Sequence, residues 1–435
     1  MDRRDFIHCT GAAAISSAFN STLAPQARAA EPVPSGKANP RGKADHCIVL
    51  WLSGGMAQID TFDPKPTIGD ATAKKPGAYY PSINTAVPGV RVCEHLPRTA
   101  KLMEHVTAIR SVHHDVIDEH SAADNRMHTG RRTSGTIQYP SLGSIIAHER
   151  GAADDKAPAN VLIGYPSTSR GPGFLGAKHG YLYLTDTTSG PRGLARPAWL
   201  SDERTARRET LLDAARRRQR MTFPNDTLLA DTDAAIAEAR RLSGPAFMKT
   251  FDLSQEKDSL RNAYGGEFGQ RVLLARRLVE RGTRFVEVAH NLNFTNGTGW
   301  DTHNQGQLKQ HLLIQELDQA FAALITDLKA RKMLDRTLIF IGTEFGRPAA
   351  FDSGGGRGHH GKAFSVVLAG GGLRHCGAFG VTDHLAQRVV ASPVGVPDLF
   401  ASVLDAMKVD PAKMLQAGDR PVPITDYGKP ILKLS

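Results

Sequence analysis

The chain has 435 residues, carries a formal net charge of +10 at pH 7, and is 40% hydrophobic. A chain of this length and apolar content buries a large core, in one large α/β domain or two smaller ones, which excludes a largely disordered protein. No window approaches the roughly 20 consecutive apolar residues of a membrane-spanning helix, which excludes an integral membrane segment.

The first 29 residues resemble a twin-arginine export signal. Arg3 and Arg4 precede a weakly apolar segment rich in Ala and Ser, and Ala27 and Ala29 supply the small residues that signal peptidase requires. The alternative is a disordered N-terminus in which the two arginines are coincidental. With an export signal, the mature protein is expected to be periplasmic or secreted, with the twin-arginine translocase as its export partner.

The composition changes after this segment. Residues 30–45 are rich in Pro, Gly and Lys, which is typical of a linker. Residues 46–435 are expected to form the folded domain. Cys47, Cys93 and Cys376 are too few and too widely spaced for a disulfide framework, so we expect buried, small apolar residues instead.

The folded part alternates between strand and helix patterns. Its first strand is the continuous apolar run at 47–52, which ends in Ser-Gly-Gly as a buried parallel strand does. The later elements, in chain order, are a helix at 268–281 ending at Gly282, a strand at 284–290, a helix at 306–331, strands at 337–342 and 363–371, and a helix at 397–408. This order predicts an α/β fold with a doubly wound, mostly parallel sheet and helices on both faces.

Residues 198–262 interrupt that alternation. They are helical in pattern, poor in strand signals and rich in arginine, so we expect a helical insertion. The arginines are best explained as a solvated helix face, with a groove for an anionic polymer as the alternative. Export argues against a nucleic-acid partner.

Polar side chains follow several predicted strands, where ligands bind in an open α/β sheet. They are Ser53, Gly54, Gly55, Asp60 and Asp63 after the first strand, Asp301 and His303 after 284–290, Thr343, Glu344 and Arg347 after 337–342, and His359 and His360 before 363–371. In an extended segment, residues two apart point the same way, so Asp301 and His303 can face one ion together. Carboxylate with imidazole suits zinc, manganese or iron, and carboxylates alone suit calcium or magnesium.

Each of these residues also has a simpler explanation. Asp301 would cap a helix beginning near Asn304. His303 alone would be a surface histidine, and Glu344 and Arg347 would pair with each other. The convergence of several strand ends favours the metal site over these separate explanations.

A second cluster lies at 111–130, in the sequence SVHHDVIDEHSAADNRMHTG. It contains His113, His114, His120 and His128 among four acidic residues. It is either an adventitious, pH-sensitive surface patch or a segment from which one or two imidazoles reach the same site, as ligand or proton carrier.

Several motifs in this order resemble the bacterial domain of unknown function 1501 family. They are LSGGMAQIDTFDPKP, MHTGRRTSGTIQYPSLGS, GWDTH, GTEFGR and FSVVLAGGG, which follow the export signal and span nearly all of the mature chain. The resemblance implies membership of the alkaline phosphatase and sulfatase superfamily, with metal ligands at strand ends. The activity of the family itself is not established.

The resemblance also implies residue roles. Asp301, His303 and His359 match the usual Asp, His and His of one metal site, whereas Glu344 stands where the second site has an aspartate and Phe345 where it has a histidine. Gly54 takes the place of the first-strand aspartate, which leaves Asp60 as a doubtful substitute, and Gly358 replaces an aspartate of the family. Counting back from Thr129 and Gly130, the nucleophile position falls on His120, which would be a nucleophile, a general acid or a further metal ligand.

The expected function is that of an exported, metal-dependent hydrolase of sulfate or phosphate esters, acting on a small-molecule or polysaccharide ester. The expected ligands of one divalent ion (Zn, Mn or Ca) are Asp301, His303 and His359, with Glu344 and Asp60 as further candidates, while His120 and Arg347 are the catalytic candidates and Arg357 helps to neutralise the anionic group. The alternative is a non-catalytic protein of the same fold that binds anionic glycan or works in an exported complex. A purely structural metal is a third interpretation.

Overall fold

The computed structural model describes residues 42–434 except 186, 188–189, 192–193, 195–198, 243–244, 291–298 and 432. The expected export signal and residues 30–41 of the expected linker lie outside this range. The end of that linker belongs to the fold, contrary to expectation, because Gly42 N and Ala44 N donate hydrogen bonds to the carbonyl oxygens of Asp405 and Ala406 over 3.2 and 3.0 Å. Ala44 is fully buried.

The strands and helices are as follows. The strands are β1 His46–Trp51, β2 Ser82–Asn84, β3 Arg91–Cys93, β4 Val106–His113, β5 Asn160–Ile163, β6 Leu182–Leu184, β7 Phe285–Ala289, β8 Thr337–Gly342, β9 Phe364–Gly370, β10 Gly377–Phe379, β11 Val381–Thr382, β12 Val389–Ala391, β13 Val394–Gly395, β14 Met414–Ala417 and β15 Arg420–Pro423. The α-helices are α1 Pro97–Ala100, α2 His120–Thr129, α3 Leu142–Arg150, α4 Asp202–Thr222, α5 Thr227–Leu242, α6 Pro245–Met248, α7 Asp258–Tyr264, α8 Glu267–Glu280, α9 Gln310–Ala330 and α10 Val396–Ala406. Short 3-10 turns include η1 Gln58–Asp60, η3 Thr168–Arg170, η5 Ala177–His179 and η8 Asn304–Lys309.

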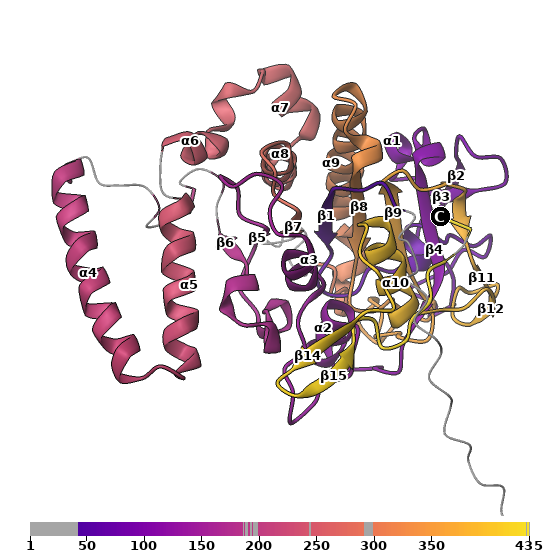
Figure 1. Ribbon diagram of the computed structural model, residues 1–435. Coiled ribbons are helices and arrows are strands. Elements are labelled where there is room, and N and C mark those ends of the chain that lie inside the picture. The colour runs from indigo at the N-terminus through magenta and orange to yellow at the C-terminus, as the bar shows by residue number, and fades with distance from the viewer. Residues whose placement is uncertain are drawn as a thin grey trace, which may run out of the picture. The chain divides into compact units, whose positions relative to one another are not determined.

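The main sheet has nine strands in the order β10-β4-β9-β8-β1-β7-β5-β6, with β13 paired to β4 (Figure 1). Strand β1 lies between β7 and β8 and runs parallel to both. Strand β9 runs antiparallel to both β4 and β8. The predicted mostly parallel sheet is therefore confirmed, with one antiparallel strand inside it that the apolar pattern of residues 363–371 did not distinguish.

Both faces of the sheet are covered, because alternate side chains of β1 enter two separate cores. Ile48 and Leu50 pack in one core with apolar side chains of α8 and α9. Val49 and Trp51 pack in the other with α3 and α10. The two pairs of helices therefore lie on opposite faces, which is the doubly wound arrangement that the continuous apolar run at 47–52 predicted (Figure 1).

Helix limits agree with the sequence pattern to within a few residues. The exception is the start of the helix predicted at 306–331, where η8 precedes α9 and Leu308 is 57% exposed. The cysteine prediction is correct for Cys47 and Cys93, which are buried, and wrong for Cys376, which is exposed.

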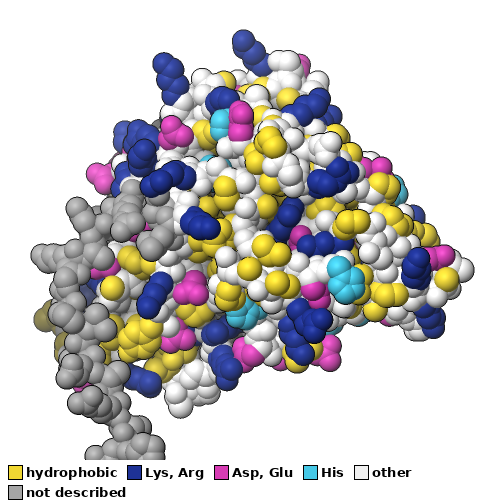
Figure 2. Space-filling model, turned by 90° about the vertical axis from the view of Figure 1, so that its right-hand side faces the viewer, with side chains coloured by type: hydrophobic (Ala, Val, Ile, Leu, Met, Phe, Trp, Pro, Cys, Tyr) yellow, Lys and Arg dark blue, Asp and Glu magenta, His cyan; other side chains and the backbone are white. Residues whose placement is uncertain are grey.

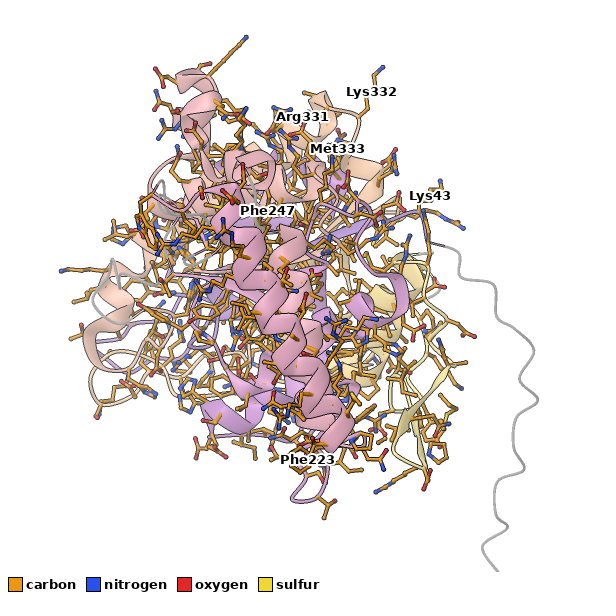
Figure 3. All side chains as sticks on the ribbon, turned by 60° about the vertical axis from the view of Figure 1, so that its left-hand side comes forward. Lys43, Phe223, Phe247, Arg331, Lys332 and Met333 are labelled. Atoms are coloured by element: carbon orange, nitrogen blue, oxygen red, sulfur yellow. The ribbon has the colours of Figure 1, made fainter. Side chains whose placement is uncertain are left out.

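Helices α4 to α7 occupy the segment expected to be a helical insertion. Helices α4 and α5 form a hairpin with Phe223 at its turn (Figure 3), and Arg220 on α4 pairs with Asp233 on α5. No side chain of α4 is buried. Its arginines therefore form the solvated helix face that the sequence predicts.

Charge is dispersed over the surface in the view of Figure 2. On that face, basic side chains lie among acidic and uncharged ones and do not gather into one large patch. Within the described residues, no helix is both long enough and apolar enough to cross a membrane.

Candidate metal centre

The residues expected at the site approach it from one edge of the sheet. Strands β1, β7 and β8 are parallel, so the segments carrying Gly54, Asp301 and Glu344 all follow carboxyl ends at that edge. His120 begins α2, after β4, and His359 precedes the antiparallel strand β9. Segments far apart in the chain thus meet because the strand directions bring their ends together.

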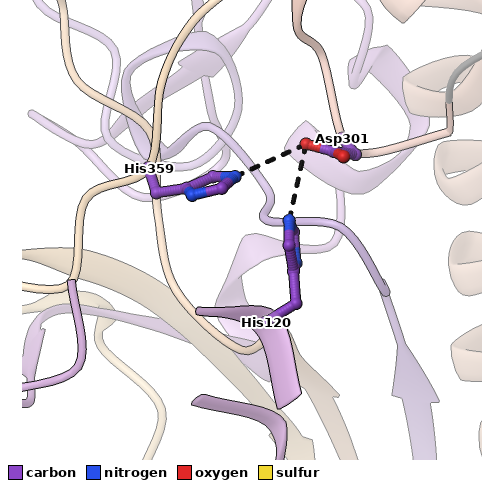
Figure 4. Close-up of side chains that lie close together, drawn as sticks. All are labelled: His120, Asp301 and His359. Carbon is purple, nitrogen blue, oxygen red and sulfur yellow. Dashed lines mark ion pairs between the residues drawn. The ribbon is translucent and has the colours of Figure 1, made fainter. Parts of the chain in front are cut away.

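Three of these side chains form one group. A nitrogen of His120, an oxygen of Asp301 and a nitrogen of His359 all lie within 4.8 Å of one another (Figure 4). Asp301 Oδ1 lies 3.6 Å from both His120 Nε2 and His359 Nε2. Two ligands bound to one tetrahedral ion at about 2.1 Å lie about 3.4 Å apart. The separations are too long for hydrogen bonds and fit a pair of metal ligands.

His303 joins the same group through its Nε2 atom. This atom lies 3.3 Å from Asp301 Oδ1 and 3.0 Å from His359 Nε2. Three imidazole nitrogens therefore face one carboxylate oxygen.

The opposite nitrogen of each imidazole faces an oxygen acceptor. Nδ1 of His120 lies 2.8 Å from Glu344 Oε1, Nδ1 of His303 lies 3.3 Å from Asp352 Oδ2, and Nδ1 of His359 lies 3.1 Å from the carbonyl oxygen of Asp118. An acceptor oxygen holds the ring proton on Nδ1 and leaves the Nε2 lone pair for a metal. His120 Nε2 is buried and makes no hydrogen bond to any of the described residues. A cation between these nitrogens would satisfy lone pairs turned inward in this way, so the side chains fit a metal ion.

The electrostatics of the group point the same way. Asp301 and Glu344 raise the pKa of His120 to about 9, although burial opposes this. Burial favours a higher pKa for Asp301, but His120, His359 and Arg347 outweigh it and hold that pKa well below its usual range. A site that binds a proton this strongly between two carboxylates also attracts a metal cation, which displaces that proton.

Arg347 lies beside the group, and all its donors are engaged. Its side chain is fully buried, and Nη2 donates to Asp301 Oδ1 over 2.5 Å and to the Gly54 carbonyl. Its remaining N–H groups donate to the carbonyl oxygens of Gly55, Arg357 and Gly358. Since a guanidinium has five N–H groups, none remains for a substrate anion. The structure therefore gives Arg347 a positioning role, which corrects the expectation that it contacts the reacting group.

Gly54 closes the site at the end of β1. Its backbone N–H donates to Glu344 Oε1 over 2.6 Å, and its φ is +119°. A Cβ atom there would lie 2.4 Å from Asp301 N. No side chain fits, so position 54 contributes its peptide group instead of a carboxylate.

Asp60 and Arg357 pair with each other in the interior. Both side chains are fully buried, and Arg357 Nε lies 2.8 Å from Asp60 Oδ2. Asp60 also accepts hydrogen bonds from Tyr79 N and Gln307 Nε2. Its carboxylate is thus engaged away from the three converging side chains, and Arg357 is neutralised before any substrate anion arrives.

The other histidines of the 111–130 segment lie elsewhere. His114 Nε2 lies 2.6 Å from the carbonyl oxygen of Glu344 and so supports the segment that follows β8. His128 is buried against Asp124 and Glu287. Of the four histidines, His120 alone contributes to the group, in keeping with the expectation that one or two would.

A cleft of about 890 Å³ opens beside the group and is lined by His120, Asp301 and Glu344 at one end. Its other lining comes from the first turns of α2 and from the segment around η3. The site is therefore reachable by a ligand much larger than a single ion.

Sequence reasoning missed Asp352 and the loop 165–170. Asp352 stands before Ser-Gly-Gly-Gly, which indicates a turn, and its Oδ1 does accept from Gly354 N and Gly356 N. Its second role, as the acceptor that faces Nδ1 of His303, is seen only in the structure. The loop 165–170 follows β5, a short strand that the sequence analysis did not identify, although the strand-end rule would have selected this loop.

Fold and site together define an α/β protein with a candidate metal centre at the carboxyl edge of its sheet. The model of the family "Protein of unknown function (DUF1501)" matches residues 44–435, and the chain belongs to this family. This confirms the resemblance seen in the sequence motifs. No curated protein gave a significant match.

Solved structures with a similar fold come from phosphatases and sulfatases. A variant of alkaline phosphatase PafA has a TM-score of 0.41 at 10% identity, with 91% of this chain and 99% of that chain covered. Phosphonate monoester hydrolase SpPMH from Silicibacter pomeroyi has a TM-score of 0.38 at 11% identity, with 89% of this chain and 76% of that chain covered. PsFucS1 sulfatase from Pseudoalteromonas sp. has a TM-score of 0.38 at 11% identity, with 90% of this chain and 71% of that chain covered. At these TM-scores the similarities carry no argument about activity.

Proposed function

We propose that the protein is a metal-dependent hydrolase of phosphate or sulfate esters. The observation that carries the proposal is the convergence of His120, Asp301 and His359 within 4.8 Å, with the buried Nε2 of His120 unpartnered. His303 completes a set of three imidazoles and one carboxylate. Such a donor set suits zinc or manganese, whereas calcium prefers oxygen ligands. A divalent ion bound there would supply Lewis-acid polarisation of an ester oxygen.

The protein's own groups orient this site. Glu344 holds the Nδ1 proton of His120 and is itself fixed by Gly54 N. Phe345 is fully buried and packs against the rings of His120 and His359 at centroid distances of 4.8 and 4.6 Å, which excludes water from that side. The opposite side opens onto the cleft, through which both an ester and the water that hydrolyses it would enter.

His120 is assigned to the metal and not to nucleophilic attack. Its Nδ1 faces Glu344 and its Nε2 faces Asp301, so neither nitrogen is directed at the open cleft. Of the three roles expected from the position of Thr129 and Gly130, which were nucleophile, general acid and metal ligand, the proposal takes the third.

Export through the twin-arginine route is part of the proposal and rests on residues 1–29 alone. Folding before export would allow the protein to acquire its metal inside the cell. Cleavage after Ala29 in protein recovered from the periplasm or medium would support this part.

The test combines metal content with turnover. Protein purified from its native host is expected to contain about one transition metal per chain, and Asp301→Ala to contain none. A panel of phosphate and sulfate monoesters should then show turnover that a chelator abolishes. The control is Asp383→Ala, because Asp383 pairs with the exposed Arg388. Metal-replete protein without turnover on any ester would overturn the hydrolase and leave a structural metal.

A further inference from the structure

The cleft beside the metal centre has two distinct walls. The start of α2 supplies one wall, with Glu119, Ser121 and Asn125. The segment 165–170, which follows β5, supplies the other. The sequence motifs and the proposed hydrolysis account for the metal end of this cleft and leave these walls unexplained.

The walls present hydroxyl groups that are free to bind a ligand. Ser53, Ser121 and Thr168 line the cleft, are exposed, and make no side-chain hydrogen bond among the described residues. Ser167 and Ser169 differ, because their hydroxyls lie 2.8 Å apart and Ser169 donates to Asp124. Asn125 donates through Nδ2 to the carbonyl of Arg131, and its Oδ1 remains able to accept.

Tyr165 adds an aromatic ring to the second wall. It lines the cleft with 63% of its surface exposed. An apolar ring of this size held at the rim of a polar cleft is suited to stack on a ligand that has an apolar face and polar edges.

The described lining offers little positive charge. Arg170 is its sole Lys or Arg, and it pairs with Glu287 over 2.5 Å and with Asp124 over 3.2 Å. Glu119 adds a negative charge to the lining, whereas Asp301 is paired with Arg347 and Glu344 with His120. A polymer with many sulfate or phosphate groups would meet repulsion here without compensating cations.

We infer that the cleft lined by the start of α2 and by residues 165–170 binds an uncharged sugar unit, with Tyr165 stacked on its ring and the free hydroxyls bonded to its hydroxyl groups. The substrate would then carry a single anionic ester, directed to the metal centre, on a neutral glycan. The role of the ester rests on the proposed function, whereas the binding of the sugar does not. This inference also disfavours the alternative of a protein that binds anionic glycan.

The experiment measures binding without turnover. Neutral hexasaccharides of β-1,4-linked glucose, α-1,4-linked glucose and agarose-type galactose are titrated into the full-length mature protein by calorimetry, alongside dextran sulfate. At least one neutral hexasaccharide is expected to bind, with and without chelator. Tyr165→Ala should weaken that binding about tenfold, and Tyr165→Phe should retain it. Tyr427→Ala is the matched control, since Tyr427 is 79% exposed and is not in the cleft lining.

The outcomes separate the two proposals. Binding that survives chelation in a protein without ester turnover would support the sugar site and overturn the hydrolase. Failure of every neutral hexasaccharide to bind would overturn the sugar site. Tighter binding of dextran sulfate at this cleft, or equal binding of the hexasaccharide by Tyr165→Ala, would overturn it as well. Each of these results would hold even in a protein that hydrolyses simple esters.

Discussion

Nδ1 of His120 lies 2.8 Å from Oε1 of Glu344, and that same oxygen accepts the Gly54 N–H. One buried carboxylate oxygen thus ties the end of β1 to the first residue of α2. It also determines which nitrogen of His120 is turned toward Asp301. We therefore propose that Glu344 acts on the candidate metal centre through His120.

Replacing Glu344 by glutamine tests this arrangement. Glu344→Gln keeps an oxygen for the Gly54 and His120 donors but removes the charge that makes the imidazole a stronger ligand. Metal affinity should fall about 10- to 100-fold, measured by competition with a chromophoric chelator. Glu203→Gln, at the exposed Glu203–Arg207 pair on α4, should have the affinity of the wild type. Equal affinity in both variants would contradict the role of Glu344.

Arg347 should be needed for stability more than for anion binding. Arg347→Lys retains a positive charge but cannot donate to the four carbonyl oxygens and the Asp301 carboxylate that the guanidinium reaches. The free energy of unfolding, measured by urea titration, should fall by about 3 kcal/mol. Arg388→Lys, whose side chain is exposed where it pairs with Asp383, should change the free energy of unfolding little. A folded Arg347→Lys protein of normal stability but raised KM would indicate direct contact with substrate.

A substitution at Asp60 distinguishes between two roles of this residue, partner in a structural ion pair and metal ligand. Asp60→Asn leaves Arg357 charged and buried without its partner, so the free energy of unfolding should fall by about 3–5 kcal/mol. The metal content of the remaining folded protein should be unchanged. Glu203→Gln, at the exposed pair with Arg207, should be near neutral in both measurements. Loss of metal from folded Asp60→Asn would restore Asp60 as a ligand.

His128 should make stability depend on pH. Burial and Arg170 lower its pKa, but Asp124 and Glu287 outweigh them and raise it to about 9. Because this lies above the unfolded value of about 6.5, the stabilisation is fully present below pH 6.5 and is lost as pH rises through about 9. His128→Gln should therefore be less stable than wild type by about 3 kcal/mol near pH 6, with the difference shrinking toward pH 9.5. Parallel curves for wild type and variant over this range, measured by urea titration, would contradict the assignment.

The main elements could be predicted from local patterns. The apolar run at 47–52 is buried on both faces, so its composition alone indicates a central parallel strand. The Leu and Phe spacing in α9 likewise follows directly from packing one helix face on the sheet. Strand β9 was found as a strand, but its antiparallel direction depends on its partners, which no local pattern records.

The site was predictable in part. Asp301 and His303 stand out because they lie two residues apart after a strand, and in the structure His303 Nε2 lies 3.3 Å from Asp301 Oδ1 at the candidate metal centre. Counting from Thr129 and Gly130 left His120 as a nucleophile, a general acid or a metal ligand, and its contacts with Glu344 and Asp301 suit the last of these roles. The charges of Arg347 and Asp60 would suit either a role in the reaction or a role in stabilising the fold. Only the buried partners of these two side chains distinguish between those roles.

The sequence by itself therefore determined the long apolar strands and amphipathic helices, the sheet class and several strand ends where polar side chains gather, because hydrophobic periodicity and strand-end position are local properties. The tertiary structure alone decided which nitrogen of each histidine faces Asp301 and which charges are neutralised within the interior. It also decided that the cleft beyond His120 is lined by hydroxyl groups. These are relations between residues hundreds of positions apart, such as His120 and Glu344, and they exist only once the strands of the sheet have been placed side by side.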